Sequence, residues 1–168
     1  MPYVDPNTVH NPATATVAPA SWGDTVRDDL EFLVAPPQFA ARATATQNVS
    51  TSTDTVLTAP AEDYDTDGMH STVTNTGRGR AVTAGKYRAS AIVQWDSDTT
   101  GRREVRFLVN GSTQHVVSVM GASAGVVQNV QKMLVLAAND YVEVQVWQNS
   151  GGTRTPQLLQ FAMHFEAR

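Results

Sequence analysis

The residues best placed to do chemistry are three aspartates within residues 63–68, which read Asp-Tyr-Asp-Thr-Asp-Gly. Aspartates at every second position followed by glycine are typical of the start of a calcium loop, because calcium prefers carboxylate oxygens. The twelfth position of such a loop needs a bidentate glutamate, and here it is Thr74. We therefore expect an acidic turn at the rim of a sheet, with Asp63, Asp65 and Asp67 kept only as candidate calcium ligands.

The histidines do not supply a second site. They are scattered along the chain without the spacing of metal ligands, at His10, His70, His115 and His164. A lone histidine in a strand is more often structural than catalytic. The sequence also lacks a nucleophile elbow, a phosphate-binding loop and a paired-carboxylate pattern. It therefore predicts that the chain is not an enzyme and binds no cofactor.

Composition narrows the range of partners. The chain has 168 residues and a net charge of -4. It has no cysteine, so disulfides and zinc ribbons are excluded. No basic stripe accompanies the arginines, and we expect no nucleic-acid partner. No apolar run approaches the length of a membrane span, and the N-terminus does not read as a secretory signal.

The clearest structural signal lies in residues 80–95. A short strand and a tight turn at Ala84 and Gly85 lead into a long strand. In that strand apolar side chains occupy alternate positions, at Tyr87, Ala89, Ala91, Val93 and Trp95. Polar residues fill the positions between, with only Ile92 out of step. This alternation indicates a strand with one buried face.

Most of the chain after residue 38 also reads as short strands separated by turns. Asn110 and Gly111 form the strongest hairpin signal, and residues 62–68 and 75–77 read as turns. We expect strands at residues 39–46, 70–74, 78–83, 103–109, 114–120, 126–136, 141–148 and 158–165, and either one strand or a pair of short strands at residues 49–57. Eight to ten strands at this spacing predict an all-β sandwich or barrel over residues 38–168.

The N-terminal part differs from the rest. Residues 1–20 hold four of the eight prolines and have no sustained period, which is typical of an extended arm or a disordered tail. Residues 21–34 predict one short helix, with Ser21 as N-cap and with Pro36 and Pro37 ending it before residue 38. A lone helix of this length is marginal in water, so its apolar stripe needs a partner. That partner could be its own domain, the same helix of sister subunits or a larger assembly.

Two stretches resemble a known superfamily. Residues 64–87 run from Tyr-Asp through a strand, a glycine turn and a second strand to Ala-Gly-Lys-Tyr. This order resembles the jelly-roll superfamily of the complement globular head and tumour necrosis factor. Residues 133–144 resemble a second motif of that family, with Asn139 at a glycine position that needs positive φ. The terminal strand also fits, so the resemblance implies a jelly roll of antiparallel strands.

The helix carries a second resemblance. Residues 21–33, with a proline-rich arm before them and two prolines after, resemble the N-terminal segment of accessory virion proteins of tailed bacteriophages. The two resemblances together imply a homotrimer attached to major capsid or tail proteins. The residues that we expect to anchor it are Tyr3, Val4, Trp22, Val26, Leu30 and Leu33.

The strand at residues 141–148 provides a physical check on the trimer. If its valines fill the sandwich, Tyr141 and Trp147 point outward, and exposed large aromatics often mark an interface. We assign Phe39, Tyr141 and Trp147 to the trimer interface. An isolated surface aromatic, or a face covered by the arm, would give the same pattern.

These observations predict a structural virion protein, assembled in the host cytoplasm, that displays a trimeric jelly roll on the phage head or tail. Adhesion to a host cell-surface glycan would be an additional role. The alternative is a soluble trimeric carbohydrate- or protein-binding module without a virion role.

Overall fold

The computed structural model describes residues 20–167, and the chain divides into two units between Val34 and Ala35. The only helix in the described part is α2 (Ala20–Val34), which belongs to the first unit. It begins one residue earlier than expected, so Ser21 lies inside the first turn and is not the N-cap. The Ser21 carbonyl accepts a hydrogen bond from Thr25 Oγ1 at 2.9 Å.

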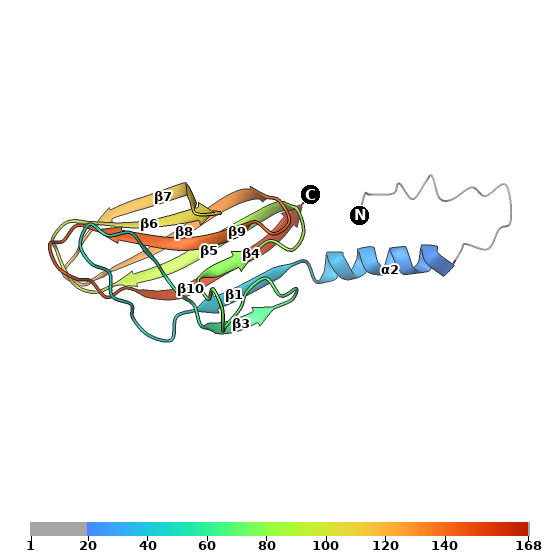
Figure 1. Cartoon of the computed structure of the whole chain (residues 1–168), viewed down its shortest axis with the longest axis horizontal. Helices are drawn as coiled ribbons and strands as arrows, with labels where there is room; N and C mark the ends of the chain where they lie inside the picture. The colour runs from blue at the N-terminus through green and yellow to red at the C-terminus, as the bar shows by residue number, and fades with distance from the viewer. Residues whose placement is uncertain (1–19, 168) are drawn as a thin grey trace. The chain divides into compact units, whose positions relative to one another are not determined.

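The second unit is a sandwich of two antiparallel five-stranded sheets, stacked face to face (Figure 1). The first, which we call the β5 sheet, has the order β3 (Ala61–Asp65), β1 (Gln38–Arg42), β10 (Gln157–Ala167), β5 (Gly85–Trp95), β8 (Val126–Leu136). The second, the β9 sheet, has the order β2 (Thr55–Val56), β9 (Tyr141–Gln148), β6 (Arg102–Val109), β7 (Ser112–Met120), and β4 (Arg78–Arg80) also pairs with β9. The prediction of an all-β jelly roll with one short helix is confirmed.

Strand β5 has the burial pattern that its sequence predicts. Its five alternating apolar residues are all buried, whereas Lys86, Arg88 and Gln94 are exposed. It pairs along its whole length with β8 and with β10 on its other side. The strand is therefore an inner strand of its sheet, and its buried face lines the core.

The core between the sheets is built on aromatic pairs. The Tyr87 and Phe165 rings meet edge to face at 5.3 Å, and Phe39 meets Phe161 in the same way at 5.1 Å. Gly79 lies under the Phe39 ring, where a Cβ would come within 2.4 Å of ring carbons. Only glycine fits this position without moving the ring.

Two turns behave as their residues predict. Asn110 and Gly111 have φ of 50° and 78° and connect β6 to β7 as a two-residue hairpin. Asn139 has φ of 74°, so it takes the left-handed conformation that the resemblance to a glycine position predicted.

The structure corrects the segment from residue 46 to residue 78. The expected acidic turn begins as a strand, β3, which pairs with β1. Residues 70–74 are not a strand. At 49–57, where one strand or a pair of short strands was expected, the structure has β2 and a single bridge from Val49 to Arg154. The chain turns back after β3 because the Asp65 carboxylate accepts backbone hydrogen bonds from residues beyond it.

Candidate functional site

Helix α2 carries an apolar stripe that its own unit leaves open to solvent. The exposed fractions of Trp22, Val26, Leu30 and Leu33 are 39%, 36%, 55% and 75%. Asp24 and Arg27, which lie off the stripe, form an ion pair at 3.3 Å. A stripe of four exposed apolar side chains on one helix is typical of a contact surface. The other predicted anchors, Tyr3 and Val4, lie outside the described residues.

The three aspartates of the calcium-like motif do not converge. Asp63 pairs with Arg42 on β1. The Asp65 carboxylate accepts hydrogen bonds from the backbone N–H groups of Asp67, Met69 and His70, at 3.1, 3.0 and 2.8 Å. Within residues 20–167 no group of three or more acidic or histidine side chains could hold a metal ion. Asp65 instead fixes the turn that leads from β3 towards β4.

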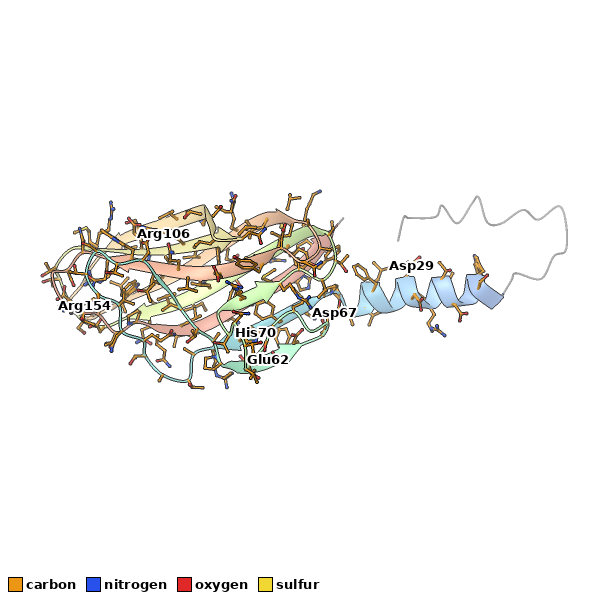
Figure 2. The ribbon with its side chains drawn as sticks, in the orientation of Figure 1. Asp29, Glu62, Asp67, His70, Arg106 and Arg154 are labelled. Carbon is orange, nitrogen blue, oxygen red and sulfur yellow. The ribbon has the colours of Figure 1, made fainter. Side chains whose placement is uncertain are left out.

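Phe39 lies in the core and not at the surface. Its side chain is fully buried, stacked on the His70 ring at 5.2 Å. The His70 ring nitrogens contact the Glu62 carboxylate and the Thr76 carbonyl oxygen, both at 3.1 Å, and Figure 2 shows His70 beside Glu62. A side chain without exposed area cannot contribute surface to a trimer, so Phe39 does not fit the interface assigned to it. Phe39 shares its buried position with Ala40 and Ala41 of the same strand.

Tyr141 and Trp147 point outward from β9 as expected, because Val142, Val144 and Val146 are fully buried. Both rings are covered by arginines of their own sheet. The Arg78 guanidinium lies 4.1 Å from the Tyr141 ring centroid, and that of Arg102 lies 5.5 Å from Trp147. The chain thus already satisfies these rings in cation–π contacts.

Ion pairs cover the rest of this surface, which we call the charged face: Arg78, Arg102, Glu104, Arg106 and Glu143. Glu104, with 8% of its side chain exposed, contacts Arg102 at 2.7 Å and Arg106 at 2.6 Å. Arg106 also reaches Asp54 at 2.7 Å, and Arg78 reaches Glu143 at 2.8 Å. Burial lowers the pKa of Arg106, but its hydrogen bonds to Glu104 and the attraction of Asp54 outweigh burial and raise it. The Arg78 pair joins β4 to β9, and the Asp54 pair joins β6 to the segment that precedes β2.

The outer face of the β5 sheet is different. Register places one row of small or uncharged residues across all five strands: Tyr64, Ala40, Ala162, Ser90 and Gln131. The neighbouring row holds Gln160, Ile92 and Asn129. We call these two rows the uncharged face. On one side of these rows lies Val127 of β8, which is 61% exposed. On the other side the next row holds His164, Arg88 and Met133, and Arg88 pairs with Glu166.

A third cluster holds the loops at one end of the sandwich. The Arg103 side chain is 1% exposed and donates to Asp98 at 3.0 Å, while Arg154 reaches the other Asp98 oxygen at 3.1 Å. The Thr100 backbone N–H, and after it Arg103 and Arg154, lower the pKa of Asp98 against the effect of burial. Figure 2 shows Arg154 at the opposite end of the sandwich from Asp67. The cluster joins the β5–β6 and β9–β10 loops.

Sequence reasoning missed the arginines of the charged face. Arg78 meets Glu143 across 65 positions of sequence, and no local pattern predicts that pairing. A local signal did exist on β6, where Arg102, Glu104 and Arg106 alternate along one face of the strand.

No helix in the described part of the chain is long and apolar enough to cross a membrane. The remaining histidines lie apart: His115 on β7 and His164 on β10. His10 is outside the described residues. No finding bears directly on catalysis, and the absence of enzymatic activity stays a prediction.

Comparison with known proteins identifies the fold. No protein-family model and no curated protein matches the sequence. Among solved structures the chain is similar to the globular domain of zebrafish complement 1qA, at 12% identity over 79% of this chain and 99% of that one, with a TM-score of 0.61. It is similar to PRD1 vertex protein P5, at 15% identity over 77% and 96%, with a TM-score of 0.57. It is also similar to Eiger TNF from S. frugiperda, at 15% identity over 78% and 91%, with a TM-score of 0.50. At these identities the likeness is one of fold.

Proposed function

We propose that the chain is a structural virion protein of a tailed phage, anchored by its N-terminal arm and helix α2, that displays a trimeric jelly roll on the head or tail surface. The observation that carries this proposal is the exposed stripe of α2 in a unit separate from the jelly roll. The likeness of the jelly roll to a vertex protein supports it.

The stripe argues for attachment because α2 has little else to stabilise it. A helix of 15 residues is marginal alone in water, and its stability comes from burying an apolar face. Leu30 and Leu33 are more than half exposed, and contact with a second protein or with sister helices would bury this face. Anchoring to the particle supplies such a surface.

Trimer formation through the jelly roll is the second part of the proposal. Both outer faces are candidates for the trimer contact. The charged face carries Tyr141 and Trp147, and the uncharged face carries no ion pair. Burying the charged face would remove water from several ion pairs, which costs several kcal/mol per ion unless each pair stays well matched. The two rows of the uncharged face contain no ion pair, so we place the trimer contact there and not at Tyr141 and Trp147.

The anchoring role is tested by incorporation into particles. Leu30→Ser with Leu33→Ser removes half of the stripe, and we expect this variant to be lost from purified particles. Asp24→Ser with Asp28→Ser changes two exposed positions off the stripe and is the matched control. Deletion of residues 1–34 should also abolish incorporation while the circular dichroism of the jelly roll is kept. Incorporation of the truncated chain would refute the anchoring role.

A second candidate function is a carbohydrate-binding module without a virion role. A polar cavity beside Arg78 favours it, and a chain that binds sugar but never enters particles would support it over the first.

A further inference from the structure

A hollow of about 310 Å³ opens beside the charged face, between the turn that follows β3, strand β4 and the turn between β8 and β9. Its polar lining includes Ser71, Asn75, Arg78, Arg80, Asn139 and Tyr141. A second hollow of about 290 Å³ shares Asn75 and Arg78 with it. The two adjoin at the Arg78 side chain, and each approaches the size of a small-ligand site.

Arg78 is held in place with hydrogen-bonding capacity to spare. Its Nε donates to Glu143 Oε1 at 2.8 Å, and its guanidinium stacks on Tyr141. No acceptor for its Nη1 or Nη2 is found within residues 20–167, and 39% of the side chain is exposed at the hollows. The guanidinium therefore presents fixed donors that a bound acceptor could use.

Arg80 adds a positive charge that no carboxylate offsets in the described part of the chain. Its Nη1 donates to the Asn139 side-chain oxygen at 3.3 Å, and it forms no ion pair there. A single long hydrogen bond to a neutral amide leaves most of its donors to solvent. Arg80 and Arg78 lie two residues apart on β4 and line the same hollow.

Four of the nearby carboxylates are already engaged. Glu143 is paired with Arg78. Asp65 accepts three backbone N–H groups, and Glu62 faces His70. Asp140 accepts from the Ala137 N–H at 2.7 Å and from Asn110 at 2.8 Å. The lining of the 310 Å³ hollow thus includes two arginines and no carboxylate, although the chain as a whole is acidic.

We infer that this cavity binds a saccharide bearing a carboxylate or phosphate group. The two guanidinium groups match an oxyanion, because charge-assisted hydrogen bonds from arginine to carboxylate or phosphate are strong and directional. The amides of Asn75 and Asn139 and the Ser71 hydroxyl both donate and accept, which suits the hydroxyls of a sugar ring. The inference rests on the second candidate function, for which it names the ligand class, and it does not depend on virion anchoring because the cavity belongs to the jelly roll alone.

The experiment is a calorimetric titration of the purified full chain with glucuronate, glucose 1-phosphate and neutral glucose. We expect glucuronate or glucose 1-phosphate to bind and glucose to bind more weakly than either. Arg80→Gln should weaken binding by about tenfold or more, because it removes charge-assisted hydrogen bonds. Arg80 is exposed, so the fold should survive, and the melting temperature checks it.

Arg102→Gln is the matched control. Arg102 also stacks on an aromatic ring of β9 and pairs with a glutamate, but it lines neither hollow. We expect its affinity to equal that of the unmodified chain. Binding of glucuronate alone would identify a sugar acid, and binding of glucose 1-phosphate alone a sugar phosphate.

Three results would overturn the inference: no binding of either anionic sugar, equal binding of neutral glucose, or unchanged binding by Arg80→Gln. The measurement needs no particles, so its failure is distinct from a failure of virion anchoring.

Discussion

The two outer faces of the sandwich use opposite chemistry on the same architecture. The charged face on the β9 sheet pairs its own ions, with Glu104 between Arg102 and Arg106 and with Arg78 on Glu143. The uncharged face on the β5 sheet has alanine, serine and amide side chains at its centre. The ion pairs of the charged face are formed within one chain, and covering them would cost desolvation free energy. The side chains of the uncharged face carry no charge, so covering them costs less.

This difference changes how the outward aromatics are interpreted. Tyr141 and Trp147 qualify as interface residues by type and direction. Their rings are nevertheless occupied by Arg78 and Arg102, so a partner would have to displace or accommodate those arginines. In this chain an interface is better sought on a surface whose side chains make no ion pairs or cation–π contacts within the chain.

The sharpest way to break the comparison is to place a charge at the centre of the uncharged face. We expect Ser90→Arg to convert the proposed trimer to monomer, because an arginine there would be buried without a partner. Analytical ultracentrifugation measures the change. Ser118→Arg is the control: Ser118 is exposed on β7 opposite Glu104, on the other sheet, and should leave the trimer intact. A monomeric unmodified chain, or dissociation by Ser118→Arg alone, would contradict the assignment.

The next largest effect should come from replacing one glutamate on each sheet and comparing the losses in the free energy of unfolding. Glu104→Ala leaves Arg106 partly buried, with 18% of its side chain exposed, and without its closest ion-pair partner. We expect a loss of about 2 kcal/mol in the free energy of unfolding. Glu166→Ala on β10 breaks its more exposed pair with Arg88 and should cost about 0.5 kcal/mol. Urea denaturation measures both values, and equal losses would remove the distinction between the faces.

The smallest effect concerns the dependence of stability on acidic pH, to which Asp98 contributes. The folded-state pKa of Asp98 lies below the ordinary value of 3.8, so its ionised form favours the folded state. That contribution is fully present above pH 3.8 and disappears as the pH falls through the lower, folded-state pKa. We expect Asp98→Asn to flatten the acid side of the melting-temperature profile. A profile identical to that of the unmodified chain below pH 3.8 would show that Asp98 does not contribute.

Local pattern predicted those parts of the fold that depend on local physics. The alternation of β5, the hairpin at Asn110 and the positive φ of Asn139 follow from side-chain periodicity and backbone preference. Strand β3 was missed because its sequence, Ala-Glu-Asp-Tyr-Asp, has low strand propensity. Its pairing with β1 and the ion pair of Asp63 with Arg42 form it, and both are tertiary contacts.

The candidate sites were predicted less well for the same reason. The α2 stripe is periodic and could be found, but the cavity at Arg80 forms from three segments that lie up to 73 positions apart, from Gly68 to Tyr141. The burial of Phe39 also depends on distant residues, His70, Gly79 and Phe161. Sequence alone contains no signal for contacts at such separations.

The pairing of β1 with β3 on one side and β10 on the other has a mechanical consequence (Figure 1). Gln38, where the chain enters the sandwich, lies opposite His164 near the end of the last strand. A pulling force applied at Gln38 and at the end of the sandwich that holds Arg154 would act on β1 along the axis of the strand. Its ladders to both neighbours would then share the force in shear, and could not open one hydrogen bond at a time. The strand nearest the proposed anchor is therefore arranged to resist a pulling force, because its hydrogen bonds would have to break together.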